Sequence, residues 1–129
     1  MRLKFHSLAA VAALVVGSAA MAECQQPQLP KIADGASATV EVMVQSQQAV
    51  KQYLSEGDSY LKCLKGEEQA AIAAAQKAGV KPDSDAAAAL LDKRQAITKN
   101  YNAAVDAMQS IGDRFNVEIR KYKAAHAKG

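Results

Sequence analysis

The chain has only two cysteines, and their positions constrain the fold more than any other feature of the sequence. Cys24 stands near the N-terminus, and Cys63 lies in the middle of a long segment with helical periodicity. A bridge between them would hold an extended N-terminal segment back along that helix. The residues alone leave three states open: an intramolecular disulfide, a disulfide between two chains, and two free thiols.

Residues 1–22 have the pattern of a signal peptide. Arg2 and Lys4 form a charged start, a short uncharged apolar run follows, and small residues end the segment at Ala22. The apolar run is shorter than the ~20 residues that a bilayer span needs, which disfavours a retained membrane anchor. We therefore predict a protein that is periplasmic or secreted after cleavage near Ala22.

Loss of residues 1–22 from the 129-residue chain leaves 107, the size of one domain, and lowers the formal net charge from +3 to +1. A nearly neutral domain has no electrostatic basis for binding nucleic acid. Basic side chains still crowd the C-terminal end, at Arg114, Arg120, Lys121, Lys123 and Lys128. They either complement the negative end of a helix dipole or contact anionic lipid at a membrane surface.

Two long helices joined by a short turn account for most of the domain. We expect an antiparallel hairpin over residues 37–129, with helices at about 37–78 and 84–127. Ser37 or Thr39 can cap the first helix, and Gly79 followed by Pro82 can end it. No segment alternates polar and apolar residues over the length of a strand, so the predicted fold class is all-α.

Apolar residues in both helical segments recur at alternating steps of three and four, which is the pattern of a left-handed coiled coil. In an antiparallel hairpin, facing residues should have numbers that sum to about 161 or 162. The expected pairs include Leu64 with Ile97, Gly57 with Ala104, Val40 with Tyr122 and, as the one poor match, Gln47 with Phe115. The sequence therefore predicts a coiled-coil-like two-helix hairpin.

Residues 23–36 cannot be helical throughout, because they hold two of the three prolines and an Asp-Gly turn signal. As polyproline II, this strap spans ~40 Å, which matches the ~39 Å of helix between Ser37 and Cys63. The strap should lie in a groove beside two tyrosines and bury Leu29 and Ile32 there. The expected groove residues are Pro27, Leu29, Pro30, Ile32, Tyr53 and Tyr60.

Residues 24–64 also carry a longer pattern. It reads Cys24-x-x-Pro27-x-Leu29-Pro30, then Ala33-Asp34-Gly35-Ala36-Ser37, then Met43, Gln47, Ala49, Val50 and Tyr53, and finally Asp58-x-Tyr60-Leu61-x-Cys63-Leu64. This pattern resembles a group of small exported helical proteins of Gram-negative bacteria. The resemblance implies export and pairing of the two cysteines. The group has no established activity, so the resemblance implies no site residues.

The sequence contains no catalytic or metal-binding constellation, so we predict a protein that is not an enzyme and binds no metal or other cofactor. His126, the one histidine after residue 22, lies near the C-terminus and is better placed as a partner of the helix dipole or as a solvated residue. Glu67 and Glu68 lie near the turn, opposite Lys93 and Arg94. Their basic neighbours indicate interhelical ion pairs rather than a metal site.

A second apolar stripe should widen the hairpin on the side away from the strap. This candidate interaction face consists of Val44, Ile72, Leu91, Val105 and Ile119. It is either another edge of the core, a self-association face that makes a four-helix bundle, or a groove for an unfolded or lipidic client. We predict a protein-interaction or chaperone-like module in the periplasm whose partner is an unknown protein or a second copy. The alternative is an envelope-surface binder that contacts anionic lipid through the basic C-terminal end.

Overall fold

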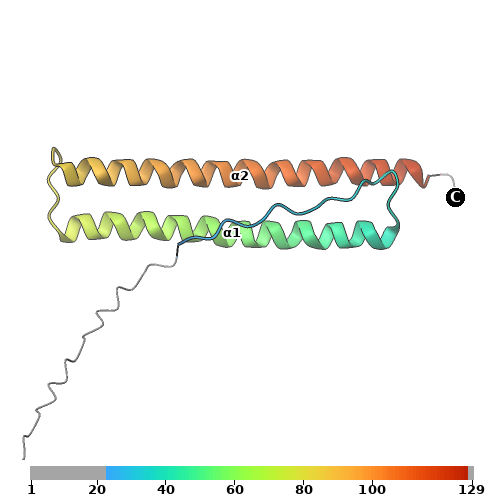
Figure 1. The fold of residues 1–129 in the computed structure, drawn as a ribbon, viewed down its shortest axis with the longest axis horizontal. Coiled ribbons are helices and arrows are strands. Elements are labelled where there is room, and N and C mark those ends of the chain that lie inside the picture. The colour runs from blue at the N-terminus through green and yellow to red at the C-terminus, as the bar shows by residue number, and fades with distance from the viewer. Residues whose placement is uncertain (1–22, 128–129) are drawn as a thin grey trace, which may run out of the picture.

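The structure is a computed structural model and describes residues 23–127. The expected signal peptide and Lys128 lie outside these residues. Two long helices, α1 (Val40–Lys77) and α2 (Asp85–Ala125), pack side by side and antiparallel, and an extended segment runs along them (Figure 1). Between residues 23 and 127 the chain forms no strand. The predicted all-α hairpin is therefore confirmed.

Short hydrogen-bonded turns fix the ends of the helices. Thr39 caps α1 and Ser84 caps α2, and each side-chain oxygen accepts a hydrogen bond from the backbone N–H three residues further on. After α1 ends, Gly79 has a φ of +64°, a conformation that glycine adopts without the steric cost of a Cβ atom. The observed ends lie within three residues of the predicted ones.

The core consists of two clusters along the contact between α1 and α2. The cluster farther from the hairpin turn centres on Ile111, the most deeply buried large side chain of the described residues, which packs with Val50, Tyr53 and Phe115. The cluster nearer to the turn contains Tyr60, Leu64, Ile97 and Ala104. Leu64 and Ile97 thus share one cluster, as the predicted pairing requires.

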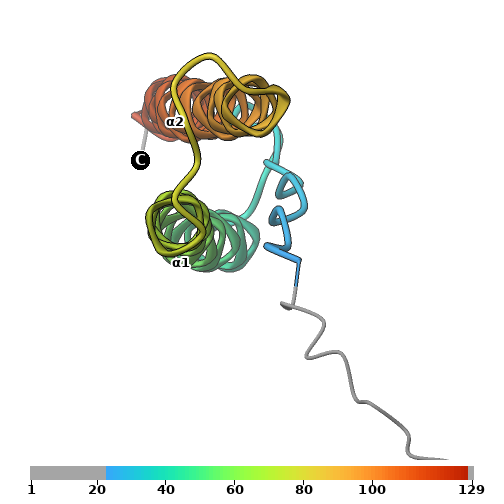
Figure 2. The same ribbon diagram turned by 90° about the vertical axis from the view of Figure 1, so that its left-hand side faces the viewer.

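The buried row of α1 differs from the predicted seam. Ser46, Tyr53 and Tyr60 are buried, whereas Val40 and Gln47 are exposed and do not fill the core as expected. The reason is that α1 has two neighbours, because α2 lies on one side and the extended segment on another (Figure 2). The buried face of α1 therefore points between α2 and the extended segment, rather than directly at α2.

Gly57 makes room for a side chain of α2. A Cβ atom built on Gly57 would lie 2.6 Å from the sulfur of Met108, and its three nearest atoms all belong to Met108. Ala104, the expected partner, is buried in the cluster of Tyr60 and Leu64. Glycine at this position therefore accommodates the flexible side chain of Met108.

The strap, residues 23–36, runs antiparallel to α1, and its start lies beside the middle of that helix (Figure 1). Cys24 and Cys63 form a disulfide, and their Cα atoms are 5.7 Å apart. Of the three cysteine states that the sequence leaves open, the structure therefore has the intramolecular bridge.

Candidate interaction surfaces

The groove under the strap has two tyrosine rings as its floor. Tyr53 and Tyr60 are buried core residues, and burial raises the pKa of Tyr53 above its ordinary range. Pro27 borders a shallow cavity of about 530 Å³ with Tyr60, and Pro30 borders a neighbouring one of about 390 Å³ with Tyr53. The strap thus lies beside both tyrosines as predicted, and its prolines line the cavities between strap and helix.

Leu29 is not buried in this groove, contrary to the prediction. Its side chain is 66% exposed, whereas Ile32 packs against the core as expected. The partly buried strap residues Cys24, Pro27, Pro30 and Ala33 recur every three positions. Polyproline II has three residues per turn, so these residues share the side that faces α1 and Leu29 falls on another side.

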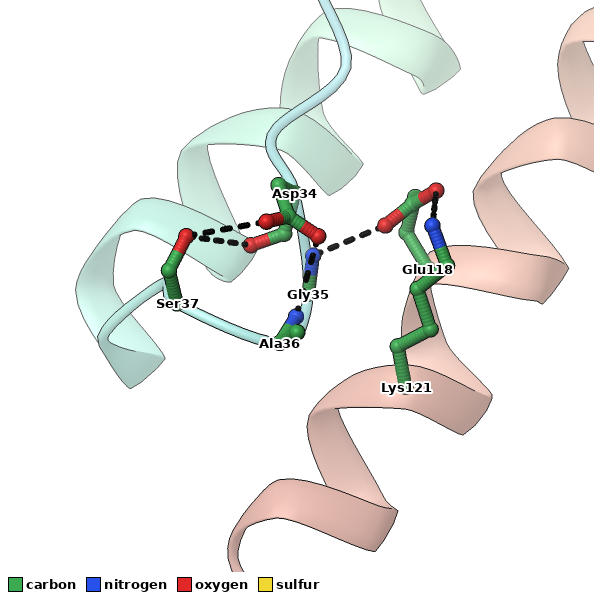
Figure 3. Close-up of polar contacts among 6 residues, drawn as sticks. All are labelled: Asp34, Gly35, Ala36, Ser37, Glu118 and Lys121. Carbon is green, nitrogen blue, oxygen red and sulfur yellow. Dashed lines mark hydrogen bonds and ion pairs between the residues drawn. The ribbon is translucent and has the colours of Figure 1, made fainter.

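A polar latch, made by residues 34–37 with Glu118 and Lys121, ties the end of the strap to α2 (Figure 3). The Gly35 N–H donates a 2.8 Å hydrogen bond to one carboxylate oxygen of Glu118, and Lys121 Nζ donates one of 2.8 Å to the other. Asp34 closes the turn by accepting from the hydroxyl of Ser37 at 3.1 Å. The latch therefore joins two segments that lie far apart in the sequence.

The strap is also anchored to α1 just before the latch. The Ala33 N–H donates a 2.8 Å hydrogen bond to Oγ of Ser46, whose side chain is buried. A buried hydroxyl is costly without a partner, so the strap amide satisfies a group that α2 leaves unbonded. This contact explains why a serine, rather than an apolar residue, stands in the inward row of α1.

Gly35 approaches the backbone of α2 so closely that no side chain fits. An added Cβ atom would overlap the carbonyl oxygen of Glu118 and would lie 2.9 Å from the backbone nitrogen of Tyr122. The sequence identified Asp34-Gly35 as a turn, but nothing local in it indicated this contact with α2. The strap can close against both helices because residue 35 is a glycine and has no Cβ atom.

The latch also sets the charge state of its carboxylate. The hydrogen bond from Lys121 lowers the pKa of Glu118 below its ordinary range, and the backbone N–H of Gly35 lowers it further. The same contact with Glu118 raises the pKa of Lys121. At neutral pH, Glu118 is therefore an ionised acceptor held by two donors.

The strap covers one side of the two-helix layer (Figure 2). The helical positions of the candidate interaction face, relative to the buried rows of α1 and α2, place it on the opposite side. Arg114, Val117 and Lys121 of α2 line a cavity with the strap, which identifies the strap side of that helix. We call the opposite side, with Val44, Ile72, Leu91, Val105 and Ile119, the strap-free face.

The strap-free face contains both core edges and exposed apolar residues. Leu91 is 54% exposed and Val44 is 45% exposed. Ile72, Val105 and Ile119 are partly buried, and Ile119 packs against the core. A shallow depression of about 420 Å³ lies beside Leu91. This face therefore presents apolar surface to the solvent at two places along the hairpin.

The acidic residues near the turn do not form one network. Glu68 pairs with Arg94 across the helices at 2.9 Å, as an interhelical ion pair of the predicted kind. Glu67 instead lies beside the disulfide, where its carboxylate and the sulfurs of Cys24 and Cys63 are all within 4.8 Å of one another. Because both sulfurs are bonded to each other, they are not thiolate ligands for a metal in this state.

The C-terminal end of α2 presents several exposed cations. Arg114, Arg120 and Lys123 are exposed, and Lys121 is paired with Glu118. His126 caps the helix, with its ring stacked 4.1 Å from that of Tyr122. Within residues 23–127, neither helix has a stretch that is long and apolar enough to cross a bilayer.

Comparisons with known proteins were made for the whole sequence. No family model matches it, and neither the curated proteins nor the solved structures contain a match. The functional proposal therefore depends on the sequence and the structure of this chain alone.

Proposed function

We propose that this protein is a non-enzymatic, exported helical protein that acts as a protein-interaction or chaperone-like module in the periplasm. The observation that carries the proposal is the strap-free face, where Leu91 and Val44 expose large apolar side chains on a narrow, rod-like molecule. These two side chains lie on a helix face that no other described element covers, and uncovered apolar surface is a contact point for other proteins. The small, open cavities suit such a surface better than a pocket for a small molecule.

Two features support the proposed compartment. Residues 1–22 have the charged start, apolar run and small-residue end of a signal peptide. The disulfide between Cys24 and Cys63 is compatible with an oxidising space, such as the periplasm.

The test uses the processed, oxidised protein and a model client, thermally unfolding citrate synthase, whose aggregation is followed by light scattering. The same preparation, carrying a tag, is used to retain partners from a periplasmic extract. We expect the protein to slow aggregation or to retain specific partners. The double variant Val44→Glu/Leu91→Glu should lose this effect, because it places charges on the strap-free face.

The matched control is Val117→Glu. Val117 is 39% exposed on the strap side of α2, so the control makes the same chemical change on the other side of the helix. It should keep the activity of the unmodified protein. If the unmodified protein neither protects the client nor retains any partner, the proposal is wrong. Equal loss in both variants would show that the strap-free face is not the binding surface.

A second candidate function is contact with anionic lipid through the basic C-terminal end. It is favoured by the exposed cations Arg114, Arg120 and Lys123, which gather in the last turns of α2. Binding to vesicles of phosphatidylglycerol should weaken as salt rises, and replacing the three residues by glutamine should abolish it. Absent or salt-independent binding would remove this candidate.

A further inference from the structure

Three side chains that can bind a metal meet where the strap begins. Cys24 comes from the strap, and Cys63 and Glu67 come from α1. Their two sulfur atoms and one carboxylate oxygen lie within 4.8 Å of one another, and all three residues are partly buried. The two sulfurs are bonded to each other, so what this group can bind depends on whether the disulfide is intact.

The helix itself holds two of these side chains together. Cys63 and Glu67 are four positions apart, and residues with this spacing lie on the same side of an α-helix, one turn from each other. Both residues lie well inside α1, so their spacing does not depend on the disulfide. Two of the three possible ligands therefore stay paired in either state of the cysteines.

The strap keeps Cys24 close to this pair even without the covalent bond. The hydrogen bond from the Ala33 N–H to the hydroxyl of Ser46 holds the strap on α1 independently of the disulfide. Between this bond and Cys24, the strap residues Pro27 and Pro30 lie beside the two buried tyrosines. A short tether keeps the thiol of Cys24 at a high effective concentration near Cys63.

The spacing of the three side chains suits one tetrahedral metal ion. Two thiolates on a zinc ion are ~3.8 Å apart, and a thiolate and a carboxylate oxygen are ~3.6 Å apart. The Cα atoms of Cys24 and Cys63 are 5.7 Å apart, so rotation of the side chains can separate the sulfurs to this distance. Cys63 borders the cavity of about 530 Å³, from which a water molecule can take the fourth position.

No positive charge among residues 23–127 is paired with Glu67. On the strap, residues 23–30 include no cation. Of the nearby cations on the helices, Lys65 lies over an aromatic ring of α2, Arg94 is paired with the neighbouring glutamate, and Lys62 is exposed. The positions three and four residues from Cys63 or Glu67 on α1 are all uncharged: Ser59, Tyr60, Leu64, Gly66, Ala70 and Ala71. Glu67 is therefore available as a ligand, although the sequence predicts an ion pair for it.

From this geometry we propose that reduction of the disulfide creates a site for a zinc-type divalent cation, with Cys24, Cys63 and Glu67 as its protein ligands. A dithiol donor gives the bridge two electrons and two protons, so that two thiols form and the donor becomes a cyclic disulfide. The cation then displaces both thiol protons and binds two thiolates and one carboxylate. The two sulfur ligands disfavour Ca²⁺ and Mg²⁺, which prefer oxygen. This inference goes beyond the proposed function and does not rest on it.

The test titrates Zn²⁺ alone, and in a parallel sample Co²⁺ alone, into the processed protein kept reduced by a phosphine under argon. We expect one cation per chain with a sub-micromolar Kd, and an absorption band from sulfur-to-cobalt charge transfer. The oxidised protein should show neither. A reduced protein that binds neither cation with a Kd below ~10 μM would overturn the inference. Loss of the helices on reduction, followed by circular dichroism, would overturn it as well, because the fold could not then place the ligands.

Variants at two adjacent glutamates test whether the carboxylate is a ligand. Glu67→Gln should raise the Kd for Zn²⁺ at least about tenfold, whereas Glu67→His should restore most of the affinity, because imidazole is also a zinc ligand. The matched control is Glu68→Gln, which removes the carboxylate that pairs with Arg94 and should leave the Kd within about threefold. If Glu67→Gln bound Zn²⁺ as tightly as the unmodified protein, or if Glu67→His restored nothing, the proposed ligand set would be wrong.

Discussion

Replacing Gly35 by alanine tests whether the strap truly closes against α2. The φ angle of Gly35 is not positive, so alanine can adopt the same backbone conformation and the change adds only a methyl group. That methyl group would overlap the carbonyl oxygen of Glu118 and would lie 2.7 Å from its carbonyl carbon. The obstacle is helix backbone, which cannot rotate away as a side chain can. The strap turn must therefore move off α2.

The magnitude follows from overpacking and has an internal control. Inserting one methyl group into a tightly packed site costs about 1–3 kcal/mol, so Gly35→Ala should lower the free energy of unfolding by that amount. Gly66→Ala makes the same change inside α1, where an added Cβ would meet no atom within 4 Å. It should stabilise the protein by about 0.5–1 kcal/mol through helix propensity. The two variants should therefore differ by roughly 1.5–4 kcal/mol.

The assay is urea denaturation of the oxidised proteins followed by circular dichroism, combined with hydrogen exchange of the residue 35 amide. In the unmodified protein this amide is protected by its hydrogen bond to Glu118, and in Gly35→Ala the protection should be lost. Gly66→Ala should keep it. If Gly35→Ala were as stable as the unmodified protein and its amide stayed protected, the close approach of strap and α2 would be refuted.

Three further outcomes are expected. Replacing Cys24 and Cys63 by serine opens a loop of 39 residues and should lower the free energy of unfolding by about 4 kcal/mol in urea denaturation; an unchanged midpoint would contradict this. Ile111→Ala should cost about 2–5 kcal/mol in the same assay, because it leaves a cavity in the main core cluster, and a cost under ~1 kcal/mol would contradict its central place. Because the pKa of Glu118 is lowered, the stabilisation of the latch by its ionised carboxylate is fully present above the ordinary carboxyl pKa of ~4.3. This stabilisation is lost as the pH falls through the lowered pKa. Exchange of the Gly35 amide, corrected for its intrinsic pH dependence, should therefore accelerate in that acidic range, whereas Glu118→Gln should show no such step.

The hairpin could be predicted because its evidence is periodic and local. Alternating steps of three and four, the Thr39 cap and Gly79 at the turn each indicate the same two antiparallel helices. The disulfide could be anticipated as one of three states, because the strap length matches the helix length between its ends. These features need no knowledge of which distant residues meet.

The errors arose where a third element changes which side of a helix is buried. A seam between two helices predicts that Gln47 is buried and Ser46 is exposed. In the structure Ser46 is buried instead, because the strap packs against that side of α1 and bonds its hydroxyl. Leu29 was expected inside because it is apolar, whereas the three-residue period of the strap decides which side chains face α1. The contact of Gly35 with Glu118 depends on three-dimensional closure, which no local pattern encodes.

The strap also imposes an order on assembly. Synthesis delivers a chain from its N-terminus, so the strap is made first, yet its partners are made later. Cys24 bonds to Cys63, which lies 39 positions further on, and the amide of Gly35 bonds to Glu118, which lies 83 positions further on. The covalent bond joins the strap to α1 alone, so it can form before α2 packs, and it then holds the strap beside α1 until the hairpin closes. The strap is thus made first but completes its contacts last. The disulfide reduces the conformational entropy that is lost when the end of the strap docks on α2.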